Sequence, residues 1–411
     1  MIDLTAPRGD PWANPAAYWP RIDAATSELD PPFGVLHRGA LAHNAHDLLR
    51  RAQGTPIRVA SKSLRVRAVL ESVLAIPGFA GVLAYTLPEA LWLADAGFDD
   101  IVVAYPTSDR GAIAALATDE RRAAAITLMV DDVSQLDCID SVLPPAQRET
   151  VRVALELDAS LHSPVLGHVG VFRSPVGSPA ALASLASAAA GRAGFRVVGI
   201  MAYEAQVAGV PNAGPGRIAI RAMQRASIAE LAERRAEAVA LVRSVVRAHG
   251  NDLEFVNGGG TGSIESTRLD DSVTEIAAGS GLFGPGLFDH YEQFAPAPAV
   301  GFALSVVRRP APAVATVLGG GWIASGPPTA NRQPLPVWPP GLSTLPREAA
   351  GEVQTPLRGA AARGLEVGDR VWLRHAKSGE VSEHLNVLHV VDGDQVIDSV
   401  PTYRGEGKAF L

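Results

Sequence analysis

Short runs of β-branched and other apolar residues alternate with longer helical patterns along the chain as far as Tyr291. Eight of these runs predict strands, at 58–61, 81–85, 101–104, 125–130, 151–158, 196–203, 253–257 and 272–278. Segments between them, such as 88–97 and 228–249, suit amphipathic helices. The alternation is typical of parallel strands joined by crossover helices. Because eight such units close a barrel, we predict an α/β fold in which 31–294 form a (β/α)8 TIM-type barrel.

The pattern changes after Tyr291. Prolines crowd 295–298 and 327–340, and the helical periodicity ends. Strand-like runs follow at 301–307, 314–318, 370–373, 387–391 and 395–400. They predict a C-terminal β-rich domain over 295–411. The first thirty residues, 1–30, carry several prolines and tryptophans, and we expect this N-terminal segment to pack on the body of the protein.

Composition narrows the class of partner. The 411 residues are 47% hydrophobic and 19% charged, which is ordinary for a globular protein, and the formal charge is −7. This balance argues against nucleic acid or an anionic membrane as a partner, since a protein that binds either needs a concentrated basic face. The single Cys138 excludes an intrachain disulfide, the start lacks a signal-peptide pattern, and no apolar run reaches the roughly 20 residues of a membrane span. We expect a cytoplasmic protein with a small-molecule substrate.

Two motifs suggest chemistry. The stretch Gly258-Gly259-Gly260-Thr261-Gly262 follows the seventh predicted strand, where backbone N–H groups in an almost bare turn can hold a phosphate. Lys62 stands at the end of the first predicted strand. Alone, each has an ordinary explanation: the glycine stretch could be a tight turn, and Lys62 could be a surface charge. Together at strand ends of one barrel, they predict a site for pyridoxal 5'-phosphate.

The chain resembles the alanine-racemase-like pyridoxal phosphate enzymes of fold type III, in the branch that contains D-threonine aldolase and D-serine dehydratase. The segments that carry the resemblance are Arg58 to Ser63, Gly199 to Glu204, Gly258 to Gly262, Gly281 to Pro285 and the tail Val400 to Gly407. The tail is similar to that of proteins called amino acid deaminases or aldolases. The resemblance implies a barrel with a C-terminal β domain, a homodimer, and Lys62 as the Schiff-base lysine.

In the lyases of this branch, a histidine and a nearby cysteine or aspartate hold a divalent metal. His375 matches the histidine, but Lys377 stands at the second position and is a poor ligand. Either Glu380 or Glu383, or the imidazole of His384 or His389, replaces it, or no metal binds. Of these, we assign His375 and Glu380 as the metal ligands, and Lys62 and His375 as the catalytic candidates.

Further residues are assigned to the cofactor or the substrate. Tyr203 ends the sixth predicted strand. We place its phenol near the cofactor; the alternative is an aromatic side chain that only closes the mouth of the barrel. Tyr291 is placed near the phosphate, or else packs under the second domain. Among Arg152, Asp158, His162 and Arg173, which frame the fifth strand, only Arg173 suits a clamp for the substrate carboxylate, because its guanidinium forms a fork.

We therefore predict a pyridoxal phosphate lyase that acts on a D-amino acid with a β-hydroxyl, by retro-aldol cleavage or by dehydration and deamination. The first alternative is an amino acid racemase of the same fold, which needs a second acid/base opposite Lys62, such as Tyr403 or another tail tyrosine from a partner subunit. Two further alternatives remain. One is a noncatalytic protein that binds pyridoxal phosphate, and the other is a barrel enzyme that acts on a sugar phosphate.

Overall fold

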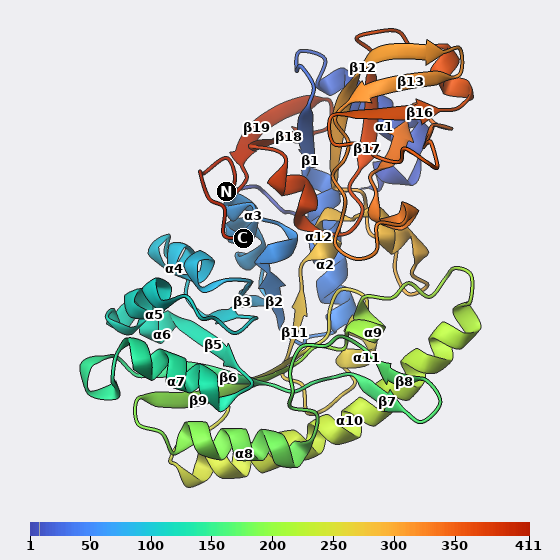
Figure 1. Cartoon of the computed structure of the whole chain (residues 1–411). Helices are drawn as coiled ribbons and strands as arrows, with labels where there is room; N and C mark the ends of the chain where they lie inside the picture. The colour runs from blue at the N-terminus through green and yellow to red at the C-terminus, as the bar shows by residue number, and fades with distance from the viewer. Residues whose placement is uncertain (8) are drawn as a thin grey trace. The chain divides into compact units, whose positions relative to one another are not determined.

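The computed structural model describes residues 1–7 and 9–411, which divide into two compact units (Figure 1). The barrel unit comprises Leu49–Lys62, Pro77–Ala278 and Phe410–Leu411, and the sheet unit comprises Met1–Leu48, Ser63–Ile76 and Gly279–Ala409. Within the described residues, no helix combines the length and the apolar character that crossing a bilayer requires.

The barrel unit is built on a closed barrel of eight parallel strands, as predicted. The strands are β2 (Ile57–Ala60), β3 (Phe79–Ala84), β4 (Ile101–Val103), β5 (Ile126–Val130), β6 (Val151–Glu156), β9 (Phe195–Ala202), β10 (Phe255–Gly258) and β11 (Glu275–Ala278). Each coincides with one predicted run. Most of their residues are buried, which explains why these strands appear in the sequence as nearly continuous apolar runs.

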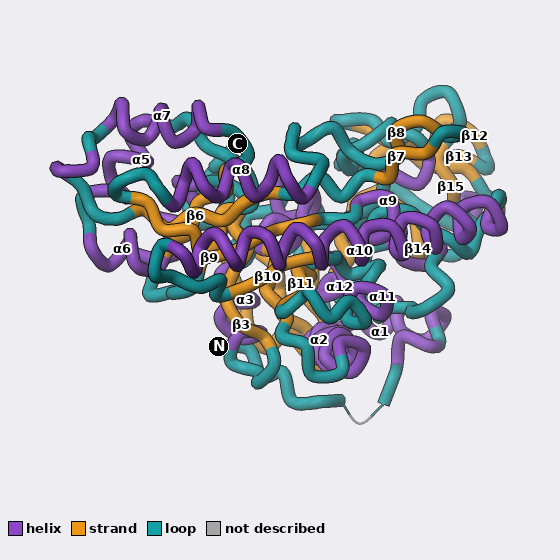
Figure 2. Tube along the Cα trace, turned by 90° about the horizontal axis from the view of Figure 1, so that it is seen from below, coloured by secondary structure: helices purple, strands orange, loops and turns teal. Residues whose placement is uncertain are grey.

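Helices cover the outside of the strands (Figure 1). They are α4 (Leu87–Asp95), α5 (Arg110–Ala117), α6 (Glu120–Ala125), α7 (Val133–Val142), α8 (Pro179–Ala190), α9 (Ala205–Ala208), α10 (Arg217–Ala248) and α11 (Ile264–Thr267). Several begin where a side chain caps the helix, as at Thr86, Asp109 and Ser178, each of which accepts a hydrogen bond from a backbone N–H of the first turn. Helices α8 and α10 lie side by side (Figure 2).

One hairpin interrupts the alternation after β6 and was not predicted. Its strands, β7 (Leu161–Ser163) and β8 (Gly167–Val169), form a two-stranded antiparallel sheet of their own. They are short, only Leu161 among their residues is buried, and half of their residues are polar, so the sequence carries no apolar pattern for them.

The sheet unit contains a nine-stranded sheet. Its strands are β1 (Phe33–His37), β12 (Val300–Ala311), β13 (Val314–Leu318), β14 (Leu335–Trp338), β15 (Ser343–Thr344), β16 (Gln354–Arg358), β17 (Arg370–Arg374), β18 (Val387–Asp392) and β19 (Gln395–Pro401). All five runs predicted after residue 295 are strands. Its helices are α1 (Pro15–Ala25), α2 (Arg38–Ala52, which continues into the barrel unit), α3 (Arg67–Leu74) and α12 (Ser280–Phe283).

Strand β1 differs from the sequence analysis, which assigned its residues to the barrel domain. It pairs with β12 in antiparallel and with β18 in parallel register, so it belongs to the sheet. The buried rings of Trp19 and Phe33 pack on Trp372, with centroids 5.9 and 5.5 Å away. Trp372 Nε1 also donates a hydrogen bond to Asp23, 2.9 Å away. The N-terminal segment is thus part of the core of the sheet unit.

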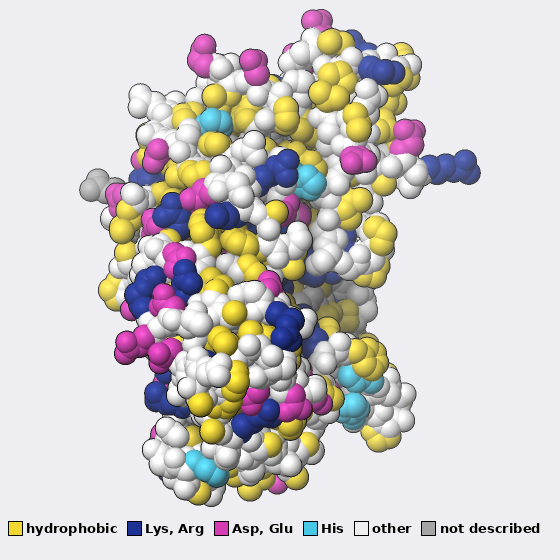
Figure 3. All heavy atoms as spheres, turned by 60° about the vertical axis from the view of Figure 1, so that its left-hand side comes forward, with side chains coloured by type: hydrophobic (Ala, Val, Ile, Leu, Met, Phe, Trp, Pro, Cys, Tyr) yellow, Lys and Arg dark blue, Asp and Glu magenta, His cyan; other side chains and the backbone are white. Residues whose placement is uncertain are grey.

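Surface charge agrees with the small net charge of the chain. On the face shown in Figure 3, the Lys and Arg side chains alternate with Asp and Glu instead of gathering into one basic area.

Closure of the barrel between β11 and β2 includes a buried ion pair. Arg58 Nε and Nη2 donate to the two carboxylate oxygens of Glu275 at 2.6 and 2.8 Å. Their side chains are 3% and 8% exposed. Removing one partner of such a pair leaves an uncompensated buried charge.

We expect Glu275→Ala to lower the free energy of unfolding of the barrel by about 3 kcal/mol, measured by urea denaturation. The loss is at the low end of the usual range because Asp100 still pairs with Arg58. The matched control is Glu254→Ala, which removes a 37% exposed partner of Arg152 and should cost at most about 1 kcal/mol. Equal losses in the two variants would contradict the structural role of the buried pair.

Candidate active site

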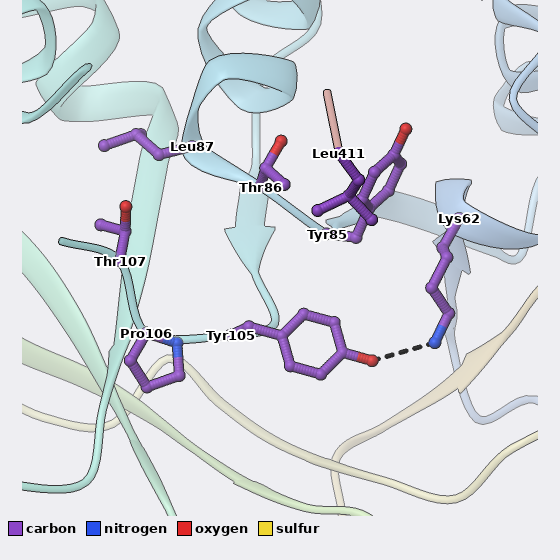
Figure 4. A pocket seen from close by; sticks show the side chains of 8 residues that line it. All are labelled: Lys62, Tyr85, Thr86, Leu87, Tyr105, Pro106, Thr107 and Leu411. Carbon is purple, nitrogen blue, oxygen red and sulfur yellow. Dashed lines mark hydrogen bonds between the residues drawn. The ribbon is translucent and has the colours of Figure 1, made fainter. Parts of the chain in front are cut away.

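Lys62 lies at the carboxyl end of β2, in the 3-10 turn Ser61–Ser63. Its Nζ donates a hydrogen bond to the hydroxyl of Tyr105, 2.9 Å away, and Figure 4 shows the two side chains pointing toward each other. Tyr105 follows β4, so the contact joins the ends of two barrel strands. Chemistry in such barrels sits on these ends.

A cavity of about 360 Å³ opens beside Lys62. Its lining comes from segments that follow β2, β3 and β4, together with the last residue of the chain: Lys62, Tyr85, Thr86, Leu87, Tyr105, Pro106, Thr107 and Leu411 (Figure 4). The lysine is therefore not an isolated surface charge. It borders a space of the size that small ligands occupy.

A series of contacts connects Lys62 to the glycine loop. The guanidinium of Arg173 lies 5.4 Å from the ring centroid of Tyr105 and 5.2 Å from that of Tyr203. A Cβ atom added to Gly260 would lie 3.3 Å from Cε2 of Tyr203. The structure thus brings together Lys62, Arg173, Tyr203 and the glycine loop, which are far apart in the sequence.

The glycine loop is too tightly packed to accept side chains. Gly259 has φ +73°, and an added Cβ would lie 2.8 Å from Oγ1 of Thr267. At Gly260, an added Cβ would lie 2.9 Å from Cβ of Ala208. Glycine is therefore required at both positions, and at Gly259 the positive φ requires it as well.

Buried charged groups hold this loop in place. Glu204 accepts hydrogen bonds from the Gly259 N–H at 3.0 Å and from the Thr267 hydroxyl at 2.5 Å, and its carboxylate pairs with Arg235 at 3.2 Å. On the other side, Arg51 Nη2 donates to the Thr261 carbonyl at 2.6 Å. The loop conformation is thus determined by the protein itself.

Not every amide of the loop is available to an anion, which refines the sequence-based expectation. The Gly259 N–H is bonded to Glu204, and the Gly260 N–H donates to Ser263 Oγ at 3.1 Å. The Gly262 N–H makes no hydrogen bond within the described part of the chain. Gly262 is therefore the loop's candidate donor to a phosphate.

The two phenols differ in acidity. Burial raises the pKa of Tyr203 to about 12, although Arg173 opposes the shift. Burial also acts to raise the pKa of Tyr105, but the positive charges of Lys62 and Arg173 outweigh it and lower that pKa below its usual value. Tyr105 is thus the phenol that gives up a proton more readily.

Sequence reasoning missed Tyr105 and Glu156. Glu156 ends β6 and is buried; burial raises its pKa to about 7, while Arg173 opposes the shift. Both residues stand at or just after the carboxyl end of a correctly predicted strand. That position was the signal that could have identified them.

His375 lies in the sheet unit and is buried, with 1% of its surface exposed. Neither ring nitrogen makes a hydrogen bond of normal geometry within the described residues, although the backbone of Phe283 and Ser378 lies near enough to favour the protonated ring. Burial nevertheless lowers the His375 pKa. A buried imidazole without hydrogen bonds is costly in a folded protein, and a metal ion would satisfy it.

Glu380 is the carboxylate beside this histidine. Its Oε1 lies 3.9 Å from His375 Nδ1. Its oxygens also accept hydrogen bonds from the backbone N–H groups of Ala376, Lys377 and Ser378 at 2.7–2.9 Å. The Lys377 amine instead donates a hydrogen bond to the backbone carbonyl of Ser325, 3.3 Å away. The donor set thus fits a metal through His375 and Glu380, without Lys377.

The remaining candidates have structural partners. The His384 ring stacks on Trp322 with centroids 5.0 Å apart, His389 Nδ1 lies 2.8 Å from Ser399 Oγ, and Glu383 pairs with Arg65. Tyr291 packs with Leu287, Phe288 and Phe294, and Tyr403 is 1% exposed; both lie in the sheet unit. Arg152 pairs with Glu254 at the amino ends of the strands, away from the Lys62 rim.

Comparison with known proteins identifies relatives. The chain is 27% identical over 272 residues to 3-hydroxy-D-aspartate aldolase of Paracoccus denitrificans strain Pd 1222, covering 62% of this chain and 61% of the relative. It is 26% identical over 278 residues to D-threonine aldolase of an Arthrobacter species, covering 67% and 65%. The alignments thus span less than two thirds of these relatives.

The fold has close counterparts among solved structures. The crystal structure of D-threonine aldolase from Filomicrobium marinum superposes with a TM-score of 0.77 at 21% identity, covering 92% of this chain and 96% of that one. Residues 36–286 match the model of the alanine racemase N-terminal domain. The chain therefore belongs to the alanine racemase N-terminal domain family, and its cofactor is pyridoxal 5'-phosphate.

Proposed function

We propose that the protein is a lyase that uses pyridoxal 5'-phosphate to cleave or dehydrate a D-amino acid with a β-hydroxyl group, of the D-threonine or D-serine type. The observation that carries the proposal is the connected set of contacts from Lys62 through Tyr105, Arg173 and Tyr203 to Gly260. The names of the relatives, which are aldolases of D-configured hydroxy amino acids, support the substrate class.

The residues present fit the cofactor. Lys62 offers an amine for its aldehyde, and the glycine loop offers a tightly packed turn, with the Gly262 amide available, for its phosphate. Tyr203 lies between that loop and Arg173. When bound, the cofactor accepts the electrons that a breaking bond at the substrate Cα releases.

Lys62 and Tyr105 supply proton transfer. Lys62 Nζ is the basic group at the cavity, and the Tyr105 hydroxyl is 2.9 Å away. A proton taken up at Nζ can therefore be passed to or from the phenol oxygen across an existing hydrogen bond. The lowered pKa of Tyr105, caused by the positive charges of Lys62 and Arg173, makes its phenol a readier proton donor than an ordinary tyrosine.

Arg173 is suited to hold the substrate carboxylate. Its guanidinium lies near the rings of both Tyr105 and Tyr203, where cation–π attraction favours its position. A guanidinium can bind a carboxylate through two parallel hydrogen bonds. Binding at this position would orient the substrate toward Lys62.

A divalent metal, where present, would be held by His375 with Glu380 as the second ligand. Such an ion would supply Lewis acidity, and polarisation of a β-hydroxyl is the chemistry that distinguishes a lyase from a racemase. The racemase alternative relied on Tyr403, but this tyrosine is buried in the sheet unit of its own chain. That burial removes the support for Tyr403 as the second acid/base.

The test is the product formed from D-threonine, D-serine and 3-hydroxy-D-aspartate by the purified protein loaded with cofactor, with L-threonine as the control. We expect glycine and an aldehyde, or a 2-oxo acid and ammonia, from at least one D-substrate. Conversion to the L-enantiomer alone would instead establish the racemase, and no turnover of any substrate would favour a noncatalytic protein that binds the cofactor.

The role of Lys62 can be tested with little ambiguity because the chain contains only three lysines, Lys62, Lys377 and Lys408. Borohydride should fix the cofactor to the chain, and peptide mapping should find it at Lys62. Lys62→Arg should abolish this attachment and lower kcat at least about 100-fold, because arginine remains protonated and cannot replace the amine. The double variant K377R/K408R keeps every charge and should retain attachment; attachment at either of those lysines would refute the assignment.

Glu156 predicts a pH dependence of substrate binding. Below its pKa of about 7, the carboxyl is mostly neutral; above it, the carboxylate attracts Arg173 and competes with the substrate. We expect the KM of wild type relative to that of Glu156→Gln to rise about threefold between about pH 6 and pH 8. The control Glu254→Gln, at the amino ends of the strands, should keep the wild-type profile. A Glu156→Gln profile parallel to wild type would exclude this competition.

A further inference from the structure

The hairpin after β6 brings two histidines and an aspartate together. His162 and His168 are directly opposite each other on β7 and β8, and Asp158 stands just before the hairpin. One ligand atom from each of the three residues lies within 4.8 Å of the others. We propose that this cluster, the hairpin site, binds a divalent transition-metal ion of the zinc class, independently of the His375 region.

Asp158 is oriented for this role. Its Oδ1 accepts hydrogen bonds from the Ser160 N–H at 3.0 Å and the Ser160 hydroxyl at 2.7 Å. Its Oδ2 lies 3.8 Å from His162 Nε2. Because ligands bound to zinc at about 2.0–2.2 Å are about 3.3–3.6 Å apart in a tetrahedral site, only a small inward movement is needed. The His162 side chain is 68% exposed and has room to rotate.

His168 supplies an independent indication of a ligand. Its Nε2 is fully buried and has no hydrogen-bond partner among the described residues. Leaving such an atom unsatisfied costs about 1–3 kcal/mol. The ring is held by Phe172, which stacks on it with centroids 4.1 Å apart, and it contacts the His162 ring at 5.2 Å. A metal bound to His168 would remove this cost without moving the ring far.

The base of the hairpin site is fixed before any ion binds. Arg234 donates hydrogen bonds to the backbone carbonyls of Asp158 and Ser160 at 2.5 and 3.0 Å. Bonds from Arg234 and from the Ser160 hydroxyl therefore set the position of the carboxylate. Such supporting contacts are typical of residues around bound metals, where they orient the ligands.

The donor set determines the class of ion. Two imidazole nitrogens and one carboxylate suit zinc and its neighbours, whereas calcium and magnesium prefer oxygen ligands alone. Three protein ligands leave a position for water. The ion would fasten β7 and β8 to Asp158 and so restrain the segment that continues into Phe172 and Arg173.

The experiment measures zinc bound by the full-length protein, loaded with its cofactor and freed of metal with EDTA, by competition with a chromophoric chelator and by metal analysis. We expect one zinc ion per chain at the hairpin site. His168→Ala and Asp158→Asn should each weaken it on the order of 100-fold or more. Asp158→Asn is informative even if His168→Ala folds poorly, because an amide oxygen can still accept the Ser160 hydrogen bonds.

Two control variants separate the hairpin site from other histidines. His375→Ala should retain the zinc at the hairpin site and lose only any ion held in the sheet unit. His249→Ala removes an exposed histidine elsewhere in the barrel unit and should leave zinc binding unchanged. The proposal is overturned if His375→Ala abolishes all zinc binding, if the hairpin variants bind zinc as wild type does, or if zinc binds only at millimolar concentration.

Discussion

The pairing of β11 with β2 is the constraint on which the candidate site depends. This ladder closes a barrel of parallel strands, and closure forces the carboxyl ends of all eight strands onto one rim. Residues that are distant in the sequence, such as Lys62 after β2 and Gly260 after β10, are then connected through the side chains that lie between them. Without closure, the lysine and the glycine loop would be two unrelated turns.

The same constraint explains what could be predicted from the sequence. Parallel barrel strands are buried on both faces, so they appear as apolar runs that a single sequence reveals, and all eight were found. Lys62 and the glycine loop were identified because their residue types are unusual at strand ends. Strand β1 was missed although its residues are apolar and buried, because the run is short and its partners, β12 and β18, come near the end of the chain.

Other parts of the site carry no distinctive residue pattern. Tyr105 resembles any core aromatic, and its role emerges only from its hydrogen bond to Lys62 and the proximity of Arg173. The elevated pKa of Glu156 is a consequence of burial, which depends on packing from several segments. The facing pair of His162 and His168 depends on the register of a hairpin whose strands are only three residues long. Sequence reasoning identifies residue types at strand ends, whereas these features arise from three-dimensional neighbours.

The hydrogen bonds that Glu204 accepts from Gly259 and Thr267 have a consequence for reconstitution of the enzyme. Because these bonds and the Arg51 contact already fix the glycine loop, the entropic cost of ordering it is met during folding and not when the phosphate arrives. Apoprotein should therefore regain its prosthetic group at a rate governed by diffusion and by formation of the covalent bond, without a slow rearrangement of the backbone.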